Sequence, residues 1–246
     1  AVPALAQLLD REHLSGERIV RRAISANLRV GDPAAVARVL AFARRSAQPE
    51  ALRVEAIGTL GAWAAPSNMD RVDGAWIAPL PARQASDAQQ ALTALVGTLD
   101  APDSTPALKV AWLDAAGRIG LTSMGPQILA RLRADTDATV RVAALRALVA
   151  LGVPEVSQGI DVAVVDSDAT VRTEAISAMP ALSIPDDTKV RNLLRVIDKG
   201  VPREQQSALG AIGRIGGAEA VGGLGRLADA LTAGSLAPDV QLDLLD

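Results

Sequence analysis

Apolar residues recur along this chain at the spacing that one face of an α-helix presents. From residue 140, for example, they fall at Val140, Ala144, Leu145 and Leu148, which is typical of a half-buried helix. Related stripes start at residues 19, 52, 108, 140, 171, 204 and 240, and the fifth residue after each start is aliphatic: Ile24, Ile57, Leu113, Leu145, Ile176, Leu209 and Leu245. The pattern predicts seven helices that each bury this aliphatic residue.

Polar residues and glycines mark the ends of these helices. Asp137 and Asp168 precede two of them, and Ser104 precedes a third. Side chains of this kind accept hydrogen bonds from the free N–H groups of a first helical turn. Glycine stands twelve residues after four of the starts, at Gly31, Gly120, Gly152 and Gly216. A left-handed glycine at that place ends a helix without a Cβ clash.

Shorter helices are expected between the seven, at about 33–44, 86–99, 122–133, 154–165, 186–199 and 218–232. No segment reads as a strand. A period near 32 residues indicates stacked helix pairs, each covering the apolar face of its neighbour. We therefore predict an all-α protein, an α-α superhelix of about six and a half helix pairs without a sheet, as one repeat domain over residues 1–246. Residues 238–246 start a helix without its glycine, so the chain is expected to end within a repeat.

Residue identities favour one repeat family over two others of similar length. A chain without tyrosine lacks the tetratricopeptide signature, and no Thr-Pro-Leu-His supports ankyrin repeats. Segments 137–148 and 168–176 resemble the short HEAT-like repeat. In that family Asp and Arg of successive repeats bond along the stack, and the resemblance assigns this ladder to Asp137, Arg141, Asp168 and Arg172. Gln205 replaces the arginine in the sixth repeat, so the implied ladder is incomplete.

One interval breaks the period. Leu52 and Leu108 are 56 residues apart, about 24 more than a repeat needs, and we assign the excess to an inserted loop at 62–85 between repeats two and three. Long connections are usually functional or disordered, and the two tryptophans of this one argue against disorder. Two interpretations stay open: Trp63 and Trp76 fill a gap between repeats, or the loop docks another domain.

The loop contains four candidate partner-binding residues. Trp63 follows a helix and is expected to pack inward, whereas Trp76 follows a turn signal and is expected to be partly exposed. Asp70 and Arg71 are expected to orient the loop through hydrogen bonds. Arg71 is the stronger candidate, because its planar fork can hold two acceptors.

The loop also carries a second resemblance, through Trp63, Pro66, Asp70, Arg71, Val72, Gly74, Trp76, Pro79, Leu80 and Pro81. It resembles the helical region of large bacterial proteins that join a sorbosone/glucose dehydrogenase-type β-propeller to a C-terminal c-type cytochrome domain. The resemblance implies that this chain is the linking domain, excised from a longer, exported or periplasmic oxidoreductase. Haem, and a quinone as a further cofactor, would then belong to other domains. The implied partners are those domains or another protein.

Composition narrows the chemistry of the chain itself. It has no cysteine, which excludes disulfides, thiolate metal sites, a cysteine nucleophile and a Cys-x-x-Cys-His haem site. His13 is the only histidine and has no second strong metal ligand beside it, and no serine has a base nearby. We therefore expect no catalytic, metal-binding or cofactor-binding residue here, and no enzyme activity in this chain.

Charge is unevenly distributed. Residues 1–60 carry nine Arg against six acidic residues, while the remainder carries sixteen basic against twenty-two acidic residues. This balance opposes nucleic-acid binding. Arg18, Arg21, Arg22 and Arg29 line part of one predicted helix, which fits a solvated face or a site for phosphate or an acidic partner. No apolar run approaches the ~20 residues that span a bilayer, so membrane insertion is not expected.

Three function classes follow. The leading one is a noncatalytic HEAT-like scaffold that positions domains or binds a protein. The second is a HEAT-like DNA glycosylase, which needs a basic concave surface and aromatic residues around a flipped base. The third is a chromophore-lyase or regulatory HEAT-like protein.

Overall fold

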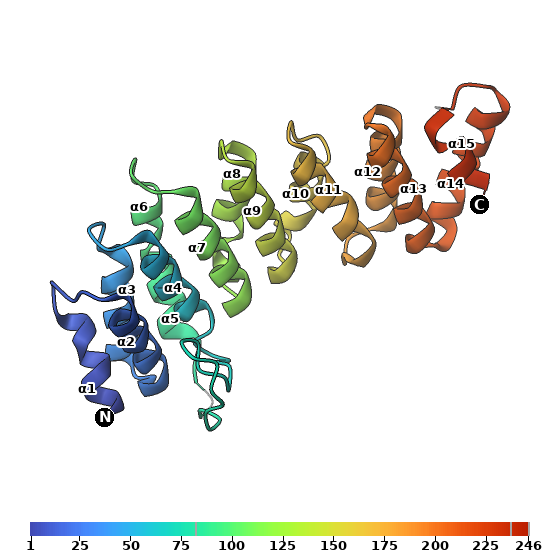
Figure 1. The fold of residues 1–246 in the computed structure, drawn as a ribbon. Coiled ribbons are helices and arrows are strands. Elements are labelled where there is room, and N and C mark those ends of the chain that lie inside the picture. Colours follow the sequence, from blue (N-terminus) through green and yellow to red (C-terminus); the bar gives the residue numbers. More distant parts are fainter. Residues whose placement is uncertain (82, 237, 246) are drawn as a thin grey trace. The chain divides into compact units, whose positions relative to one another are not determined.

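The computed structural model describes residues 1–81, 83–236 and 238–245, most of them in α-helices (Figure 1). These residues contain no strand, only an isolated antiparallel bridge between Met69 and Trp76. The predicted all-α, HEAT-like fold class is therefore confirmed. The chain divides into two compact units, residues 1–125 and 126–246, which are described in turn. A single repeat domain over 1–246 stays a prediction.

The first unit consists of successive α-helices and two 3-10 turns. Its elements are α1 (Val2–Ala6), the 3-10 turn η1 (Gln7–Asp10), α2 (Glu17–Val30), α3 (Pro33–Arg44), α4 (Glu50–Gly61), α5 (Ser86–Ala94), α6 (Val96–Leu99), α7 (Pro106–Ile119) and the 3-10 turn η2 (Thr122–Met124). Helix α3 has the predicted bounds. The helix predicted at 86–99 breaks at Leu95 into α5 and α6. In α2 Ile24 is buried as predicted, but the predicted start of the stripe, Ile19, is 49% exposed, and Val20 is buried in its place.

Helices α4 and α7 pack directly on each other, although the inserted loop and α5 lie between them in sequence. A Cβ atom added to Gly61 would lie 2.6 Å from the Cα of Ala115, so the two helix backbones approach closely at this point. Ile57 and Leu113, the predicted core residues of these helices, are buried. The packing of one repeat on the next therefore continues from α4 to α7, and the inserted residues project from the side of these repeats.

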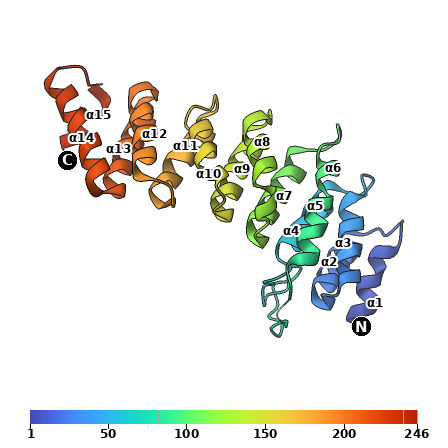
Figure 2. The ribbon, with the colours of Figure 1, turned by 180° about the vertical axis from the view of Figure 1, so that it is seen from behind.

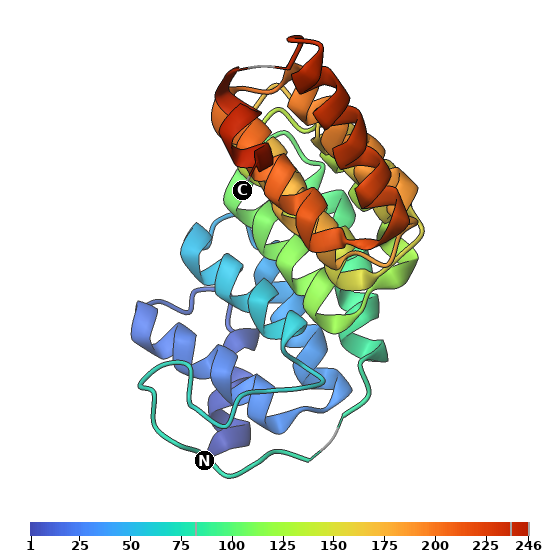
Figure 3. The same cartoon turned by 90° about the vertical axis from the view of Figure 1, so that its right-hand side faces the viewer.

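The inserted loop extends beyond the helix ends of the first unit, as both Figure 1 and Figure 2 show. In the side view of Figure 3 it lies beside the blue helices of the same unit, where the polar contacts described below join it to α2. Its described residues are 62–81 and 83–85. The loop is thus a surface feature that is tied to the repeats at its base.

The second unit also consists of successive α-helices, with one 3-10 turn. Its elements are α8 (Gly125–Ala134, which begins at the boundary), α9 (Ala138–Leu151), α10 (Glu155–Ala163), α11 (Ala169–Ala178), the 3-10 turn η3 (Met179–Ala181), α12 (Asp186–Lys199), α13 (Pro202–Ile215), α14 (Gly217–Thr232) and α15 (Pro238–Leu245). Leu145, Ile176 and Leu209 are buried as predicted. The prediction is wrong for Leu245, which is 71% exposed because α15 has eight residues and no later described helix covers it.

Most predicted helix ends are confirmed. Asp137 and Asp168 cap α9 and α11, and Gly31, Gly120 and Gly152 end their helices in the left-handed conformation. The cap assigned to Ser104 is wrong. Thr105 accepts from the Leu108 N–H at 3.4 Å instead, while the Ser104 hydroxyl is buried with no hydrogen-bond partner among the described residues.

Candidate functional site

Trp63 forms the base of the inserted loop. Its side chain is 2% exposed, so it packs inward as its position after α4 predicted. Arg83, near the C-terminal end of the loop, stacks over the Trp63 ring with its guanidinium carbon 5.6 Å from the ring centroid. The same guanidinium donates to the carbonyls of Leu28 and Arg29 near the end of α2. The two ends of the loop are thereby held together and against α2.

Asp70 fixes the neck of the loop. Its side chain is buried, its Oδ1 accepts from the Val72 N–H at 2.8 Å, and its Oδ2 lies 3.5 Å from the Ser25 hydroxyl, which donates to it. Arg22 Nη1 approaches Oδ2 at 4.0 Å. A carboxylate with this many donors holds the surrounding backbone in one arrangement. The predicted orienting role therefore fits the contacts of Asp70.

The tip beyond Asp70 is a tight turn with its own ion pair. The Asp70 N–H donates to the Ala75 carbonyl at 2.7 Å, and the Gly74 N–H donates to the Asp70 carbonyl at 2.9 Å. Asp73 accepts from the Ala75 N–H at 3.0 Å and from Arg22 at 2.7 Å. The Ala75 N–H and then Arg22 lower the pKa of Asp73, and the hydrogen bond to Asp73 raises the pKa of Arg22.

Two large apolar side chains project from this anchored turn. Trp76 is 67% exposed and Met69 is 49% exposed, and the two residues face each other across the isolated antiparallel bridge. The bridge is continued by a hydrogen bond from the Ile77 N–H to the Asn68 carbonyl at 2.7 Å. The loop therefore presents an apolar tip, Met69 and Trp76, on a hydrogen-bonded frame. Exposed apolar patches of this kind mark interaction surfaces.

Arg71 has a different position from the one predicted. Its guanidinium reaches back over α4 and donates to the Thr59 hydroxyl at 3.4 Å; the described residues offer it no second acceptor. Desolvation by the surrounding protein lowers the pKa of Arg71; Glu55 opposes this, and the positive charges of Arg118 and Arg21 add to it. Arg71 therefore ties the loop to α4 through one acceptor and not through the two that were predicted, while Asp70 accepts hydrogen bonds from both the loop and α2.

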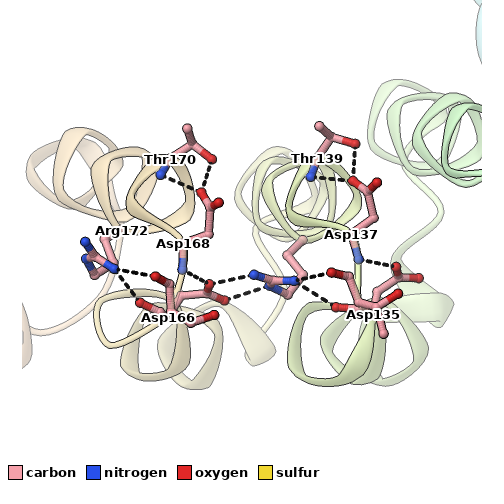
Figure 4. A network of polar contacts seen from close by, with 10 residues as sticks. Asp135, Asp137, Thr139, Asp166, Asp168, Thr170 and Arg172 are labelled. Carbon is pink, nitrogen blue, oxygen red and sulfur yellow. Dashed lines mark hydrogen bonds and ion pairs between the residues drawn. The ribbon is translucent and has the colours of Figure 1, made fainter.

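A polar ladder ties together repeats of the second unit (Figure 4). Arg141 Nε and Nη2 donate to the two carboxylate oxygens of Asp166, both at 2.8 Å. Its third nitrogen, Nη1, donates to the carbonyls of Asp135 and Thr136 at 2.9 and 3.2 Å. The side chains of Arg141 and Asp166 are only 11% and 7% exposed, so the fork-to-fork pair is largely removed from solvent.

Arg172 makes the same kind of contacts in the next repeat. Its Nη1 donates to the carbonyls of Asp166 and Ser167 at 2.7 and 3.0 Å, and its Nε and Nη2 donate to Glu204 Oε1 at 3.0 and 2.7 Å. Gln205, at the next equivalent position, donates only to the Ile197 carbonyl at 2.7 Å. An amide can donate to a backbone carbonyl but has no charge with which to hold a carboxylate.

The ladder acceptors differ from those that the repeat resemblance implied. Asp137 and Asp168 cap their own helices, accepting from the N–H groups of Thr139 and Thr170 at 2.8 and 2.7 Å. A capping carboxylate must face its own first turn, which directs it away from the next repeat. Hydrogen bonds from the threonine hydroxyl and N–H groups lower the pKa of both acids. Arg141 and Arg172 are ladder residues, whereas Asp137 and Asp168 are not.

The sequence did contain a signal for one missed acceptor. An Asp-x-Asp pair recurs after 31 residues, at 135–137 and 166–168, and the first Asp of each accepts from the N–H of the second. Burial would raise the pKa of Asp166, but hydrogen bonds from Arg141 and the Asp168 N–H lower it overall. Hydrogen bonds to Asp166 and Glu204 raise the pKa of Arg141 and of Arg172. Arg141, Asp166 and Arg172 are therefore ionised near neutral pH.

The described residues contain no group of three or more His, Asp or Glu side chains placed to hold a metal ion. Within the same residues, no helix combines the length and apolarity needed to cross a bilayer. The arrangements that stand out are the anchored apolar tip of the first unit and the ladder of the second.

No protein-family model matches the sequence, and no curated protein matches it. Among solved structures, the chain is similar to the complex of CpcE and CpcF of phycocyanin lyase from Nostoc sp. PCC7120. The TM-score is 0.39 at 18% sequence identity, over 96% of this chain and 82% of that chain. A likeness this distant carries no argument about function.

Proposed function

We propose that this chain is a noncatalytic HEAT-like scaffold whose inserted loop, residues 62–85, docks another protein domain. The observation that carries the proposal is the exposure of Trp76, 67%, on a turn that Asp70, Asp73 and Arg22 hold in place. A tryptophan with no structural task in the repeats is costly to keep in water. Tryptophan is also the residue most enriched at the energetic centres of protein interfaces.

The frame of the loop supports docking in a second way. Because the tip is already ordered by backbone and side-chain hydrogen bonds, a partner that covers it has little loop entropy to remove. Met69 beside Trp76 widens the apolar contact. A structural plug would instead bury both tryptophans, and here only Trp63 is buried.

The partner we propose is another domain of a longer oxidoreductase, the β-propeller or the c-type cytochrome domain that the sequence resemblance implies. Several residues of that resemblance are the ones that build the turn: Asp70 at its neck, Gly74 with a φ of +71° and Trp76 at its tip. Haem and a quinone would be bound in those domains, and the whole protein would be exported. This chain would contribute the connection and the docking contact.

The direct test is the affinity of this chain for the separately produced propeller and cytochrome domains. Trp76→Ala should weaken binding to one of them by at least about tenfold, since a desolvated tryptophan contributes ~2 kcal/mol or more. Val221→Ala is a matched control, because Val221 is 69% exposed on α14; it should leave affinity unchanged. Failure of both domains to bind, or equal effects of the two substitutions, would contradict the proposal.

A further inference from the structure

A hollow of about 400 Å³ lies beneath the inserted loop. Its wall is largely apolar and includes Leu28, Ala62, Ile77 and Leu80. Three arginines, Arg29, Arg71 and Arg118, line the same hollow. A cavity of this size, with an apolar wall and few charged groups, has the character of a small-molecule site.

A second hollow of about 340 Å³ adjoins it on α2, α4 and α7. Arg71 and Arg118 line both hollows, so these two side chains form the wall that the hollows share. The second hollow also contains Glu55 and Asp114. Glu55 is paired with Arg21, whose Nε lies 2.8 Å from its Oε2.

The arginines of this wall have no ion-pair partner among the described residues, although Glu55 and Asp114 line the second hollow. No carboxylate of the described residues lies within 4.0 Å of the guanidinium nitrogens of Arg71, Arg118 or Arg29. Asp70, the acid of the first hollow, already accepts hydrogen bonds from the Val72 N–H of the loop and from the Ser25 hydroxyl of α2. Asp114 lies one helical turn from Arg118 on α7 but forms no ion pair with it among the described residues. Neighbouring Arg21 and Arg22, by contrast, are both paired.

We infer that Arg71 and Arg118 bind the carboxylate or phosphate group of a small organic anion, whose apolar body fills the hollow beneath the loop. Guanidinium forks match both groups geometrically. Arg29, on the same wall, adds a third positive charge. The positive charge of Arg118 also lowers the pKa of Arg71, and a bound anion would relieve this repulsion.

Four probes separate charge from shape: 2-naphthyl phosphate, 2-naphthoate, uncharged 2-naphthol and inorganic phosphate. Titration calorimetry should show binding of at least one charged naphthyl compound, and the better of the two identifies the anionic group. Naphthol and inorganic phosphate should bind at least about tenfold more weakly, because naphthol lacks the negative charge and inorganic phosphate lacks the apolar body. Absence of binding by both charged naphthyl compounds would overturn the inference.

Substitutions locate the site. Arg71→Met and Arg118→Met should each weaken the better probe at least about tenfold, whereas Arg226→Met, which removes the same charge from α14, should leave its affinity unchanged. Equal losses in all three variants would indicate nonspecific charge attraction and overturn the inference. Trp76 does not line the hollow, so Trp76→Ala should retain full probe affinity. The anion site and the proposed docking function can therefore fail independently.

Discussion

Both units of this protein attach a loop to a helix through an arginine–aspartate pair, but with opposite consequences. In the ladder of the second unit, Arg141 and Asp166 are 11% and 7% exposed and every nitrogen of the guanidinium is used. In the inserted loop, Arg22 and Asp73 are 44% and 43% exposed. The buried pair joins repeats to one another. The exposed pair positions a turn whose apolar side chains remain in solvent.

The difference shows how one repeat architecture separates stability from recognition. The ladder directs its polar groups inward and repeats them with the period of the helices. The insertion uses polar groups at its base, at its neck and in the turn, and leaves the side chains of Met69 and Trp76 exposed. Substitutions should therefore be costly in the ladder and at the loop base, and nearly neutral for stability at the tip.

The largest effect is expected at the base of the loop. Trp63→Ala should lower the free energy of unfolding by about 3–5 kcal/mol, because it leaves a cavity and removes the ring that Arg83 covers. Trp76→Ala should change it by less than about 0.5 kcal/mol. Urea unfolding followed by circular dichroism measures both. Similar losses for the two tryptophans would show that the tip is structural.

The second-largest effect on stability is expected for the ladder pair Arg141–Asp166. Asp166→Asn should destabilise the protein by about 3 kcal/mol, since it leaves the guanidinium of Arg141 without its counter-charge in a mostly buried place. The same measurement on Asp137→Asn should give less than about 1 kcal/mol, because asparagine remains a good helix cap. A larger loss for Asp137→Asn would indicate that Asp137 is a ladder acceptor, as the repeat resemblance implied.

The pH dependence of this pair has a definite sign. The folded-state pKa of Asp166 lies below its ordinary value of 3.8. Its contribution to stability is therefore fully present above that value and is lost as the pH falls through the lower, folded-state pKa. The stability difference between wild type and Asp166→Asn should stay constant from pH 7 to about 5 and shrink below about 4. A difference that shrinks between pH 7 and 5 would contradict this assignment.

A smaller effect is expected where α4 meets α7. Gly61→Ala should cost about 1–3 kcal/mol, because the added methyl group meets the Ala115 backbone at 2.6 Å. Gly58→Ala, three residues earlier on α4, meets only the end of the Arg71 side chain at 3.5 Å. It should be neutral or slightly stabilising, since alanine favours a helix interior. Equal losses at both positions would indicate that α4 and α7 do not approach as described.

The smallest effect is expected at the exposed pair of the loop. Arg22→Met should leave the free energy of unfolding nearly unchanged, because solvated ion pairs contribute little to stability. It should instead loosen the turn, and deuterium exchange of the Gly74 and Ala75 amides is expected to accelerate. Unchanged exchange at these amides would show that backbone hydrogen bonds alone hold the tip.

The helices could be predicted from sequence because period, caps and glycines agree. Helices α3 and α12 have the predicted bounds, and Leu145 and Ile176 are buried as expected. The wrong predictions of helix bounds and burial occur where the packing of the helices, and not the local sequence pattern, decides the structure. Helix α1 is too short to show a period, and the break falls at Leu95, a good helix former, two residues before Gly97. Leu245 matches the pattern, but no helix of the described residues covers it.

The candidate sites were less predictable, because they depend on which side chains meet across elements. The sequence indicated an outward Trp76 and an inward Trp63 from their flanking residues. It could not indicate that Arg83 covers Trp63, or that Arg71 turns back toward Arg118, since these contacts bring residues together across the fold. The ladder arginines followed from the repeat. The acceptors of these arginines could not be predicted, because the capping aspartates are carboxylates at similar positions in the repeat.

The central claim, that the tip of the inserted loop is a docking contact, is tested most directly by photo-crosslinking from that tip. A benzoylphenylalanine would replace Trp76 in one variant and Val221, similarly exposed on α14, in another. Each variant would be irradiated with the propeller and cytochrome domains present. The account predicts cross-links from position 76 to one of these domains and none from position 221. Absence of cross-links from position 76, or equal yields from both positions, would contradict it.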